Sequence, residues 1–91
     1  GVTLKVMVDG TAGAGGHSEA FLESHPEIEL LIAIDQDPAA LKIAKERLAR
    51  WGSKVHFIHA NFSKLEEILQ TLKVDKIDGL LLDLGVSSMQ L

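Results

Sequence analysis

The chain has 91 residues, of which 46% are hydrophobic and 24% are charged, and it contains no cysteine. This composition excludes a disordered chain, which needs few apolar residues and a high net charge, and it excludes disulfide bonds and thiolate metal sites. The net charge of −4 is unusual for a protein that binds nucleic acid by itself, because such proteins are normally basic. No apolar run approaches the ~18 residues that span a bilayer, so we expect no membrane segment.

Four short segments have the composition of buried strands. Each is apolar along most of its length, as is typical of parallel strands that are covered on both faces of a sheet. These segments are Lys5–Asp9, Glu29–Asp35, Val55–His59 and Ile77–Asp83.

Helices are predicted between the strands, and the first two have clear end signals. The first covers residues 17 to about 24 and ends before Pro26, because proline disfavours a helical conformation in the residue that precedes it. The second begins with Asp37 as its N-terminal cap and Pro38 at its first position. Gly52 is expected to end this second helix in a left-handed conformation.

The third helix is predicted to open with a capping box. In this motif Ser63 and Glu66 would each accept a hydrogen bond from the other's backbone N–H. Apolar residues recur at helical spacing in the second and third helices. These stripes are Leu41, Ala44, Leu48 and Trp51, followed by Leu65, Ile68, Leu69 and Leu72.

Alternation of four strands with three helices predicts a parallel sheet with right-handed crossovers and helices on both faces, which is the doubly wound (Rossmann-like) α/β class. The fourth strand is as apolar as the others, yet the chain stops eight residues after it. A long apolar edge strand with nothing to cover it is an aggregation hazard. We therefore expect residues 1–91 to be the N-terminal part of a larger protein.

Polar side chains stand at the ends of all four predicted strands. Three of the strands end in a carboxylate, at Asp9, Asp35 and Asp83, and the other carries residues 59–62, which include His59 and Asn61, at its end. Aspartate is common at such positions because it starts turns and caps helices. Ligands of doubly wound folds nevertheless bind at the carboxyl ends of the strands, so three carboxylates beside a glycine-rich loop favour a ligand site.

The glycine-rich loop, residues 10–16, holds four of the chain's eight glycines. Such a loop exposes backbone N–H groups at the start of a helix, where a dinucleotide places its pyrophosphate. The dinucleotide spacing is met at Gly13 and Gly15, but Ser18 stands where the third glycine belongs. Asp35, twenty residues after Gly15, suits the ribose of either a dinucleotide or S-adenosylmethionine.

Asp9 distinguishes the two cofactors. It comes directly before the glycine-rich loop, where its negative charge would repel a pyrophosphate and attract the ammonium and sulfonium groups of S-adenosylmethionine. The sequence therefore favours a methyl donor. An NAD-dependent oxidoreductase and a non-catalytic interaction domain are the alternatives, and the polar residues at all four strand ends count against the latter.

Four motifs, taken together, can be compared with known protein families. They are Asp9–Ser18, Ile34–Pro38, Asn61–Ser63 and Leu82–Ser88. In order and spacing they resemble the bacterial-type 16S rRNA (cytosine-N4)-methyltransferase family over essentially the whole chain. Ala60 stands where that family usually has glycine and Met89 where it commonly has proline, but neither change removes a ligand-type side chain.

The resemblance implies transfer of a methyl group from S-adenosylmethionine to N4 of a cytidine in small-subunit rRNA. It places Gly15, Gly16 and His17 at the methionine end, Asp35 on the ribose and Phe62 against the adenine. Asp83 and Gln90 would close the pocket near the methyl group. The full cofactor-binding set is Asp9, Gly13, Gly15, Gly16, His17, Asp35, Asn61, Phe62, Asp83 and Gln90.

Several assignments have a second interpretation. Phe62 has the position of a core residue packed under the next helix, and His17 that of a polar residue at a helix start. Asp83 is the candidate catalytic residue, with cofactor anchoring as the alternative. His56 and His59 are three apart on a strand and point to opposite faces, so we expect no shared metal site.

The acidic balance indicates that RNA is bound mainly by parts outside this chain. Because half of the cleft and the substrate-binding region are expected to lie there too, we expect weak or no methylation by the 91 residues alone. A bacterial member would act in the cytoplasm and a eukaryotic one in a mitochondrion or chloroplast.

Overall fold

The computed structural model describes residues 5–10, 12–13, 15–82 and 86–89. Within these residues no helix has both the length and the apolar composition needed to cross a membrane. The elements in chain order are β1 (Val6–Asp9), α1 (Gly16–Ser24), β2 (Leu30–Asp35), α2 (Pro38–Arg47), the 3₁₀ segment η1 (Ala49–Lys54), β3 (Val55–His59), the 3₁₀ turn η2 (Phe62–Lys64), α3 (Leu65–Thr71), β4 (Gly79–Leu82) and β5 (Val86–Met89).

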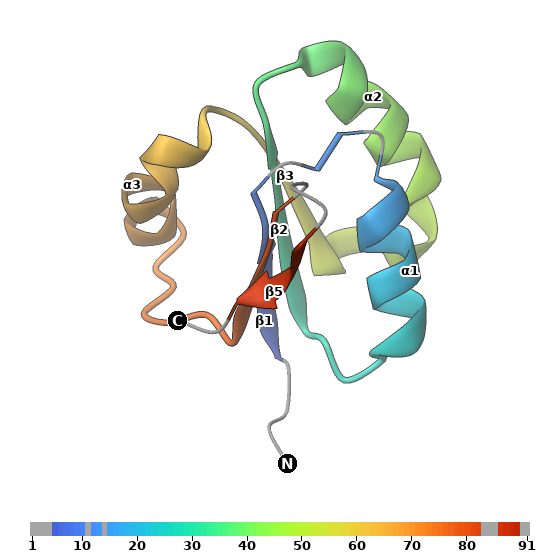
Figure 1. Cartoon of the computed structure of the whole chain (residues 1–91), viewed down its shortest axis with the longest axis horizontal. Coiled ribbons are helices and arrows are strands. Elements are labelled where there is room, and N and C mark those ends of the chain that lie inside the picture. The colour runs from blue at the N-terminus through green and yellow to red at the C-terminus, as the bar shows by residue number, and fades with distance from the viewer. Residues whose placement is uncertain (1–4, 11, 14, 83–85, 90–91) are drawn as a thin grey trace.

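These strands form one sheet in the order β3-β2-β1-β4-β5. The first four are parallel, and β5 is antiparallel to β4. Helices α1 and α2 cover one face of the sheet and α3 covers the other (Figure 1). The doubly wound α/β class is therefore confirmed. The strand order reverses between β1 and β4, so the switch point where such folds bind ligands lies at the carboxyl end of β1.

All four predicted strands are present, and β3 has the predicted bounds. The structure adds β5, which the sequence analysis did not anticipate. The expectation that β4 is an uncovered edge strand is wrong, because β5 pairs with β4 on the side away from β1. The short segment Val86–Met89, half of which is serine, lacks the apolar pattern by which the other four strands were recognised.

The core lies on both faces of the sheet because β2 is buried on both sides. Successive strand residues point to opposite faces, so Leu31 and Ala33 pack under α1 and α2, whereas Ile32 and Ile34 pack under α3. All four of these side chains are fully buried. This explains why β2 is apolar throughout rather than alternating.

Helix α2 begins as predicted and ends earlier than predicted. The Asp37 side chain accepts a hydrogen bond from the Ala39 N–H at 2.9 Å, and Pro38 occupies the first helical position. The α-helix ends at Arg47, and the chain continues through η1, in which Gly52 has φ +57°. The prediction that the helix ends at Gly52 is thus wrong, because Gly52 lies inside the 3₁₀ segment that follows the helix. The glycine is nevertheless needed there, because its positive φ disfavours other residues.

The predicted capping box at Ser63 and Glu66 is absent. The Asn61 side chain accepts the Ser63 N–H at 2.8 Å, which starts the turn η2 before α3 begins. Ser63 therefore lies inside a 3₁₀ turn, and Lys64, the cap residue of α3, makes no side-chain capping bond. The amide of Asn61 captures the N–H two residues later, a local competition typical of asparagine.

Asp78 fixes the start of β1 relative to the segment that enters β4. Its Oδ2 accepts hydrogen bonds from the N–H groups of Val6 and Lys5, at 2.8 and 2.9 Å. These donors, with Val6 contributing most, hold the pKa of Asp78 below its usual value. The two strands that form the switch point are thus joined at their amino ends.

We predict that Asn61→Ala destabilises the chain and that Ser63→Ala does not. Loss of the Asn61 acceptor should lower the free energy of unfolding by about 1 kcal/mol, whereas the exposed Ser63 side chain should contribute less than about 0.5 kcal/mol. Urea denaturation followed by the fluorescence of Trp51 measures both. An equal loss in the two variants would mean that Ser63 caps the helix in solution.

Candidate functional site

Two of the three predicted carboxylates lie side by side at the carboxyl edge of the sheet. Asp9 ends β1 and Asp35 ends β2, and these parallel strands pair with Asp9 opposite Ala33. Asp35 therefore extends two residues beyond Asp9 along the sheet. The third carboxylate, Asp83, lies outside the described residues, as does Gln90.

The Asp35 carboxylate binds two backbone N–H groups. Its Oδ2 accepts from Gly13 and its Oδ1 accepts from Asp37, both at 2.8 Å. A second bond between the same segments, from Ala12 N–H to the Ile34 carbonyl, measures 2.9 Å. The glycine-rich loop is thus held against the end of β2 and the start of α2. A carboxylate has about four acceptor positions, so the half-buried Asp35 retains acceptor capacity for a ligand.

Asp9 has a different environment, because its side chain is only 2% exposed. Its Oδ2 accepts a hydrogen bond of 2.5 Å from the hydroxyl of Ser18, which is itself fully buried. An ionised carboxylate is costly to bury without such donors. The bond ties the end of β1 to the first turn of α1, underneath the glycine-rich loop.

Ser18 is therefore a site residue that the sequence analysis missed. We noted it only as the residue in place of a third glycine. The available signal was a hydroxyl side chain near the start of a predicted helix, close to a carboxylate that ends the preceding strand. Sequence spacing alone does not show that such a hydroxyl turns inward.

Two glycines of the loop have positive φ angles, Gly13 at +54° and Gly15 at +89°. At Gly15 a Cβ atom would lie 3.2 Å from the Cβ of Ala44, so the loop packs closely against α2. At Gly13 a Cβ atom would meet nothing within 4 Å. The loop therefore has a packed side at Gly15 and an open side at Gly13.

The remaining candidates are more widely spread. His17 is exposed on the first turn of α1, and Asn61 is exposed with its side-chain oxygen on the Ser63 N–H. Phe62 is half-buried and packs against the apolar cluster beneath α3. This is the core packing considered as the second interpretation of Phe62.

Histidines at the end of the sheet do not form a group. His56 and His59 are both exposed, and the His59 Nε2 lies 2.9 Å from the Gln36 carbonyl oxygen. Among the described residues, no three His, Cys, Asp or Glu side chains come together as metal ligands.

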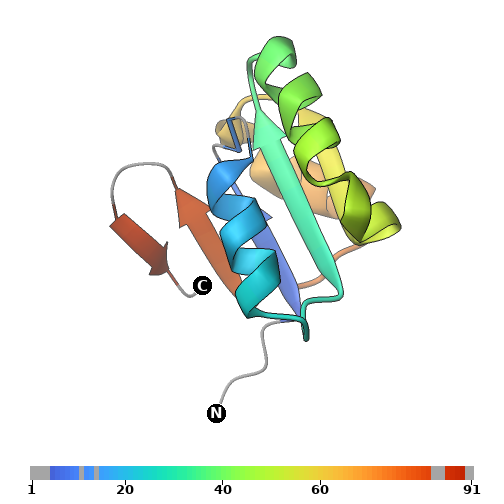
Figure 2. The same ribbon diagram turned by 90° about the vertical axis from the view of Figure 1, so that its right-hand side faces the viewer.

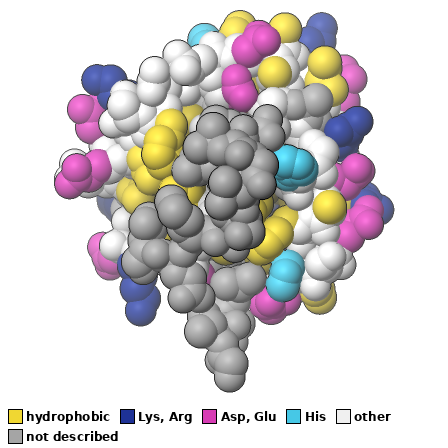
Figure 3. Space-filling view, in the orientation of Figure 1, with side chains coloured by type: hydrophobic (Ala, Val, Ile, Leu, Met, Phe, Trp, Pro, Cys, Tyr) yellow, Lys and Arg dark blue, Asp and Glu magenta, His cyan; other side chains and the backbone are white. Residues whose placement is uncertain are grey.

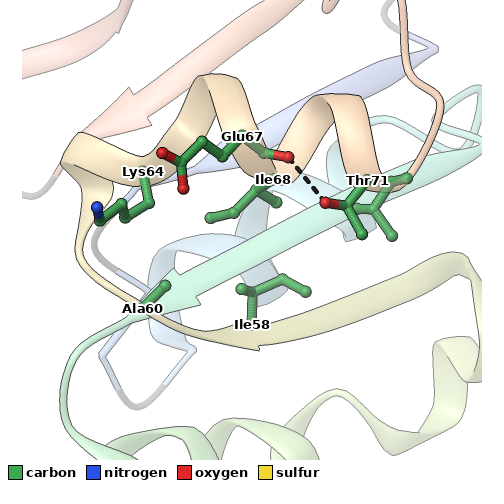
Figure 4. Close-up of a pocket in the computed structure, with 7 residues that line it drawn as sticks. Ile58, Ala60, Lys64, Glu67, Ile68 and Thr71 are labelled. Atoms are coloured by element: carbon green, nitrogen blue, oxygen red, sulfur yellow. Dashed lines mark hydrogen bonds between the residues drawn. The ribbon is translucent and has the colours of Figure 1, made fainter.

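A separate groove of about 360 Å³ lies between β3 and α3 (Figure 4). Ile58 and Ala60 line it from the β3 side, Glu67 and Ile68 from α3, and Lys64 from the turn before α3 (Figure 4). The Thr71 hydroxyl donates a hydrogen bond of 3.0 Å to the Glu67 carbonyl oxygen, so its hydrogen-bond donor is already used within α3. None of the predicted site residues lines this groove.

Fold and site together define a doubly wound α/β domain in which a glycine-rich loop is held between two carboxylates at the switch point. The MraW methylase family matches residues 3–91. The chain belongs to that family, which confirms the resemblance drawn from the four motifs.

Relatives at high identity are ribosomal RNA small subunit methyltransferases H. The protein from Saccharopolyspora erythraea is 52% identical over 86 residues, which are 94% of this chain and 26% of the relative. The protein from Protochlamydia amoebophila is 58% identical over 65 residues, which are 71% of this chain and 21% of the relative. The chain thus spans about a quarter of the length of these relatives.

A solved structure shares the fold. The crystal structure of an rRNA methylase from Streptococcus thermophilus superposes with a TM-score of 0.69 and 22% identity. The match covers 86% of this chain and 43% of that one. It supports the doubly wound architecture independently of sequence identity.

We predict that Ser18→Ala lowers the free energy of unfolding by about 1–3 kcal/mol, because it removes a hydroxyl donor from a buried carboxylate. Ser24→Ala is the matched control, since Ser24 is exposed at the end of the same helix, and it should change stability by less than about 0.5 kcal/mol. Urea denaturation measures both. Equal stability of Ser18→Ala and the wild type would show that the Asp9–Ser18 bond contributes nothing.

Proposed function

We propose that the chain is part of an S-adenosylmethionine-dependent methyltransferase that modifies N4 of a cytidine in small-subunit rRNA. Membership of the MraW methylase family and the names of the relatives support a methyltransferase of rRNA. The observation that carries the choice of cofactor is the pair of carboxylates, Asp9 and Asp35, that flank the glycine-rich loop. The N4 position rests on the resemblance of the four motifs.

Residues 1–91 would form the N-terminal part of the cofactor-binding domain, and the rest of the protein would hold most of the RNA. The chain's length, about a quarter of its relatives', agrees with this division. The bacterial relatives support action in the cytoplasm, and a eukaryotic member would act in a mitochondrion or chloroplast.

The described residues fit S-adenosylmethionine. Asp35 has acceptor positions left for the two ribose hydroxyls after binding Gly13 and Asp37. The open space beside Gly13 leaves room for a ligand against the loop. Asp9 is buried beneath the loop, where its charge acts through a medium of low dielectric and so attracts a cation more strongly than it would in water.

Further contacts follow the motif assignments. Gly15, Gly16 and His17 would contact the methionine end of the cofactor. Phe62 would offer the exposed part of its ring to the adenine, with Asn61 fixing the turn that carries it. Gln90 would close the pocket near the methyl group.

S-adenosylmethionine supplies a methyl group on a positively charged sulfur. The lone pair of the cytosine amine would displace S-adenosylhomocysteine from this methyl group, and the nitrogen would lose a proton to solvent. Because this lone pair is delocalised into the ring, Asp83 would assist by accepting a hydrogen bond from the amine and so favouring a pyramidal nitrogen. Anchoring of the cofactor is the alternative role of Asp83. The target cytosine must also unstack to reach the pocket.

Titration calorimetry on the complete protein tests the choice of cofactor. We expect S-adenosylhomocysteine to bind and NAD not to bind. Asp35→Asn should weaken S-adenosylhomocysteine binding by about 10-fold to 100-fold, since it removes a charged acceptor from the ribose. The control Asp75→Asn changes an exposed carboxylate before β4 and should bind normally. Binding of NAD alone would contradict the proposal, and binding of neither ligand would favour an interaction domain.

The catalytic role of Asp83 has its own test. We expect Asp83→Asn to lower the single-turnover rate constant of methylation by about 10²-fold or more while the affinity for S-adenosylhomocysteine stays within a factor of about two. Single-turnover methylation of 30S subunits measures the rate, and calorimetry measures the affinity. If the variant binds the cofactor normally and keeps its rate, Asp83 has no catalytic role. If binding is weakened and the rate is unchanged, Asp83 anchors the cofactor.

A further inference from the structure

Positive charge is concentrated in one segment of this acidic chain. Residues 38–54, which form α2 and η1, contain five basic side chains and one acidic side chain, a net charge of +4. The rest of the chain contains four basic and twelve acidic side chains, a net charge of −8. The overall acidity of the chain therefore conceals one basic segment.

The basic side chains of α2 are available for a partner. Lys42, Lys45 and Arg47 are exposed, and no described residue forms an ion pair with any of them. Lys42 and Lys45 are three residues apart and so project from the same side of the helix. Arg50 is engaged differently, since it pairs with Glu23 and lies 4.1 Å from the ring of Trp51.

This surface adjoins the glycine-rich loop. Helix α2 follows directly from the end of β2 and lies beside α1 on the same face of the sheet (Figure 2). The guanidinium of Arg47 is 3.2 Å from the position that a Cβ atom would take at Gly16. In the space-filling view, Lys and Arg side chains stand at the right-hand edge among acidic side chains, where Figure 1 places α2 (Figure 3).

The helix dipole explains only part of this pattern. Basic residues in the last turn of a helix interact favourably with its negative end, which accounts for Lys45 and Arg47. Lys42 lies in the middle of α2, and Lys54 lies beyond the helix at the end of η1. The helix dipole therefore does not account for the positive charges of Lys42 and Lys54.

We propose that the exposed face of α2, centred on Lys42 and Lys45, contacts the phosphate backbone of the RNA substrate. This inference rests on the proposed function, because it assigns a surface to the RNA of that reaction. Basic side chains bind phosphates by releasing counterions from the nucleic acid. The acidic remainder of the chain repels RNA, so the charge asymmetry orients the strand along α2 and towards the glycine-rich loop.

The test compares two double variants of the complete protein, each of which loses two positive charges. Lys42→Ala/Lys45→Ala removes the proposed contacts, and Lys73→Ala/Lys76→Ala removes two exposed lysines from the connection after α3. Fluorescence anisotropy with labelled poly(U) RNA measures affinity over a range of salt concentrations. The α2 variant should bind about tenfold more weakly at low salt, and its salt dependence, the slope of log K against log salt, should be shallower by about 1.4.

The control variant should keep the wild-type affinity and slope. Both variants should keep the wild-type affinity for S-adenosylhomocysteine in calorimetry. Equal losses of RNA affinity in the two variants, or no loss in either, would overturn the proposal, as would wild-type protein that does not bind RNA at low salt. Failure of the proposed function is recognised separately, because it would abolish S-adenosylhomocysteine binding in the wild type.

Discussion

The carboxylate of Asp35 connects the three pieces of chain from which the candidate site is built. It ends β2, accepts the Gly13 N–H from the glycine-rich loop and accepts the Asp37 N–H at the start of α2. Hydrogen bonds to an ionised acceptor are stronger than those between neutral groups. The loop needs such a restraint, because its glycines have few conformational preferences of their own. This side chain therefore helps to set the position of the loop, together with the bond from the Ala12 N–H to the Ile34 carbonyl and the packing of Gly15 against α2.

Asp9 restrains the same loop from below, and the two carboxylates differ in their exposure. Asp35 is half-buried and can serve a ligand as well as the backbone, whereas Asp9 is buried with the Ser18 hydroxyl. In our account Asp35 makes direct contact with the cofactor, and Asp9 contributes its charge and holds the first turn of α1. The sequence analysis assigned a charge to Asp9 but could not show that the charge lies inside the protein.

Most of the fold could be predicted because each of β1, β2, β3 and β4 is apolar along most of its length and the helices between them have distinct ends. The errors occurred where local interactions compete. The Asn61 side chain accepts the Ser63 N–H, which Glu66 would accept in the predicted capping box. The second helix ends before Gly52, because the chain continues beyond α2 in the 3₁₀ segment η1. The strand β5 could not be predicted, because its pairing with β4 depends on tertiary contact rather than on an apolar pattern.

The site was predicted in part for a similar reason. Asp9, Asp35 and the glycines stand at strand ends or turns, where topology alone determines their place. Phe62 has two roles compatible with its position, and the structure shows its packing beneath α3. Ser18 contributes through a hydrogen bond to Asp9, nine residues earlier in the chain, and such a tertiary contact leaves no local pattern in the sequence.

The account is tested most directly by a crystal structure of the complete protein with S-adenosylhomocysteine. It should show the ribose hydroxyls on the Asp35 carboxylate while the Gly13 N–H bond is retained, with the methionine end lying over the loop above Asp9. A ribose held by other residues, or an Asp9 side chain turned outward into solvent, would contradict it.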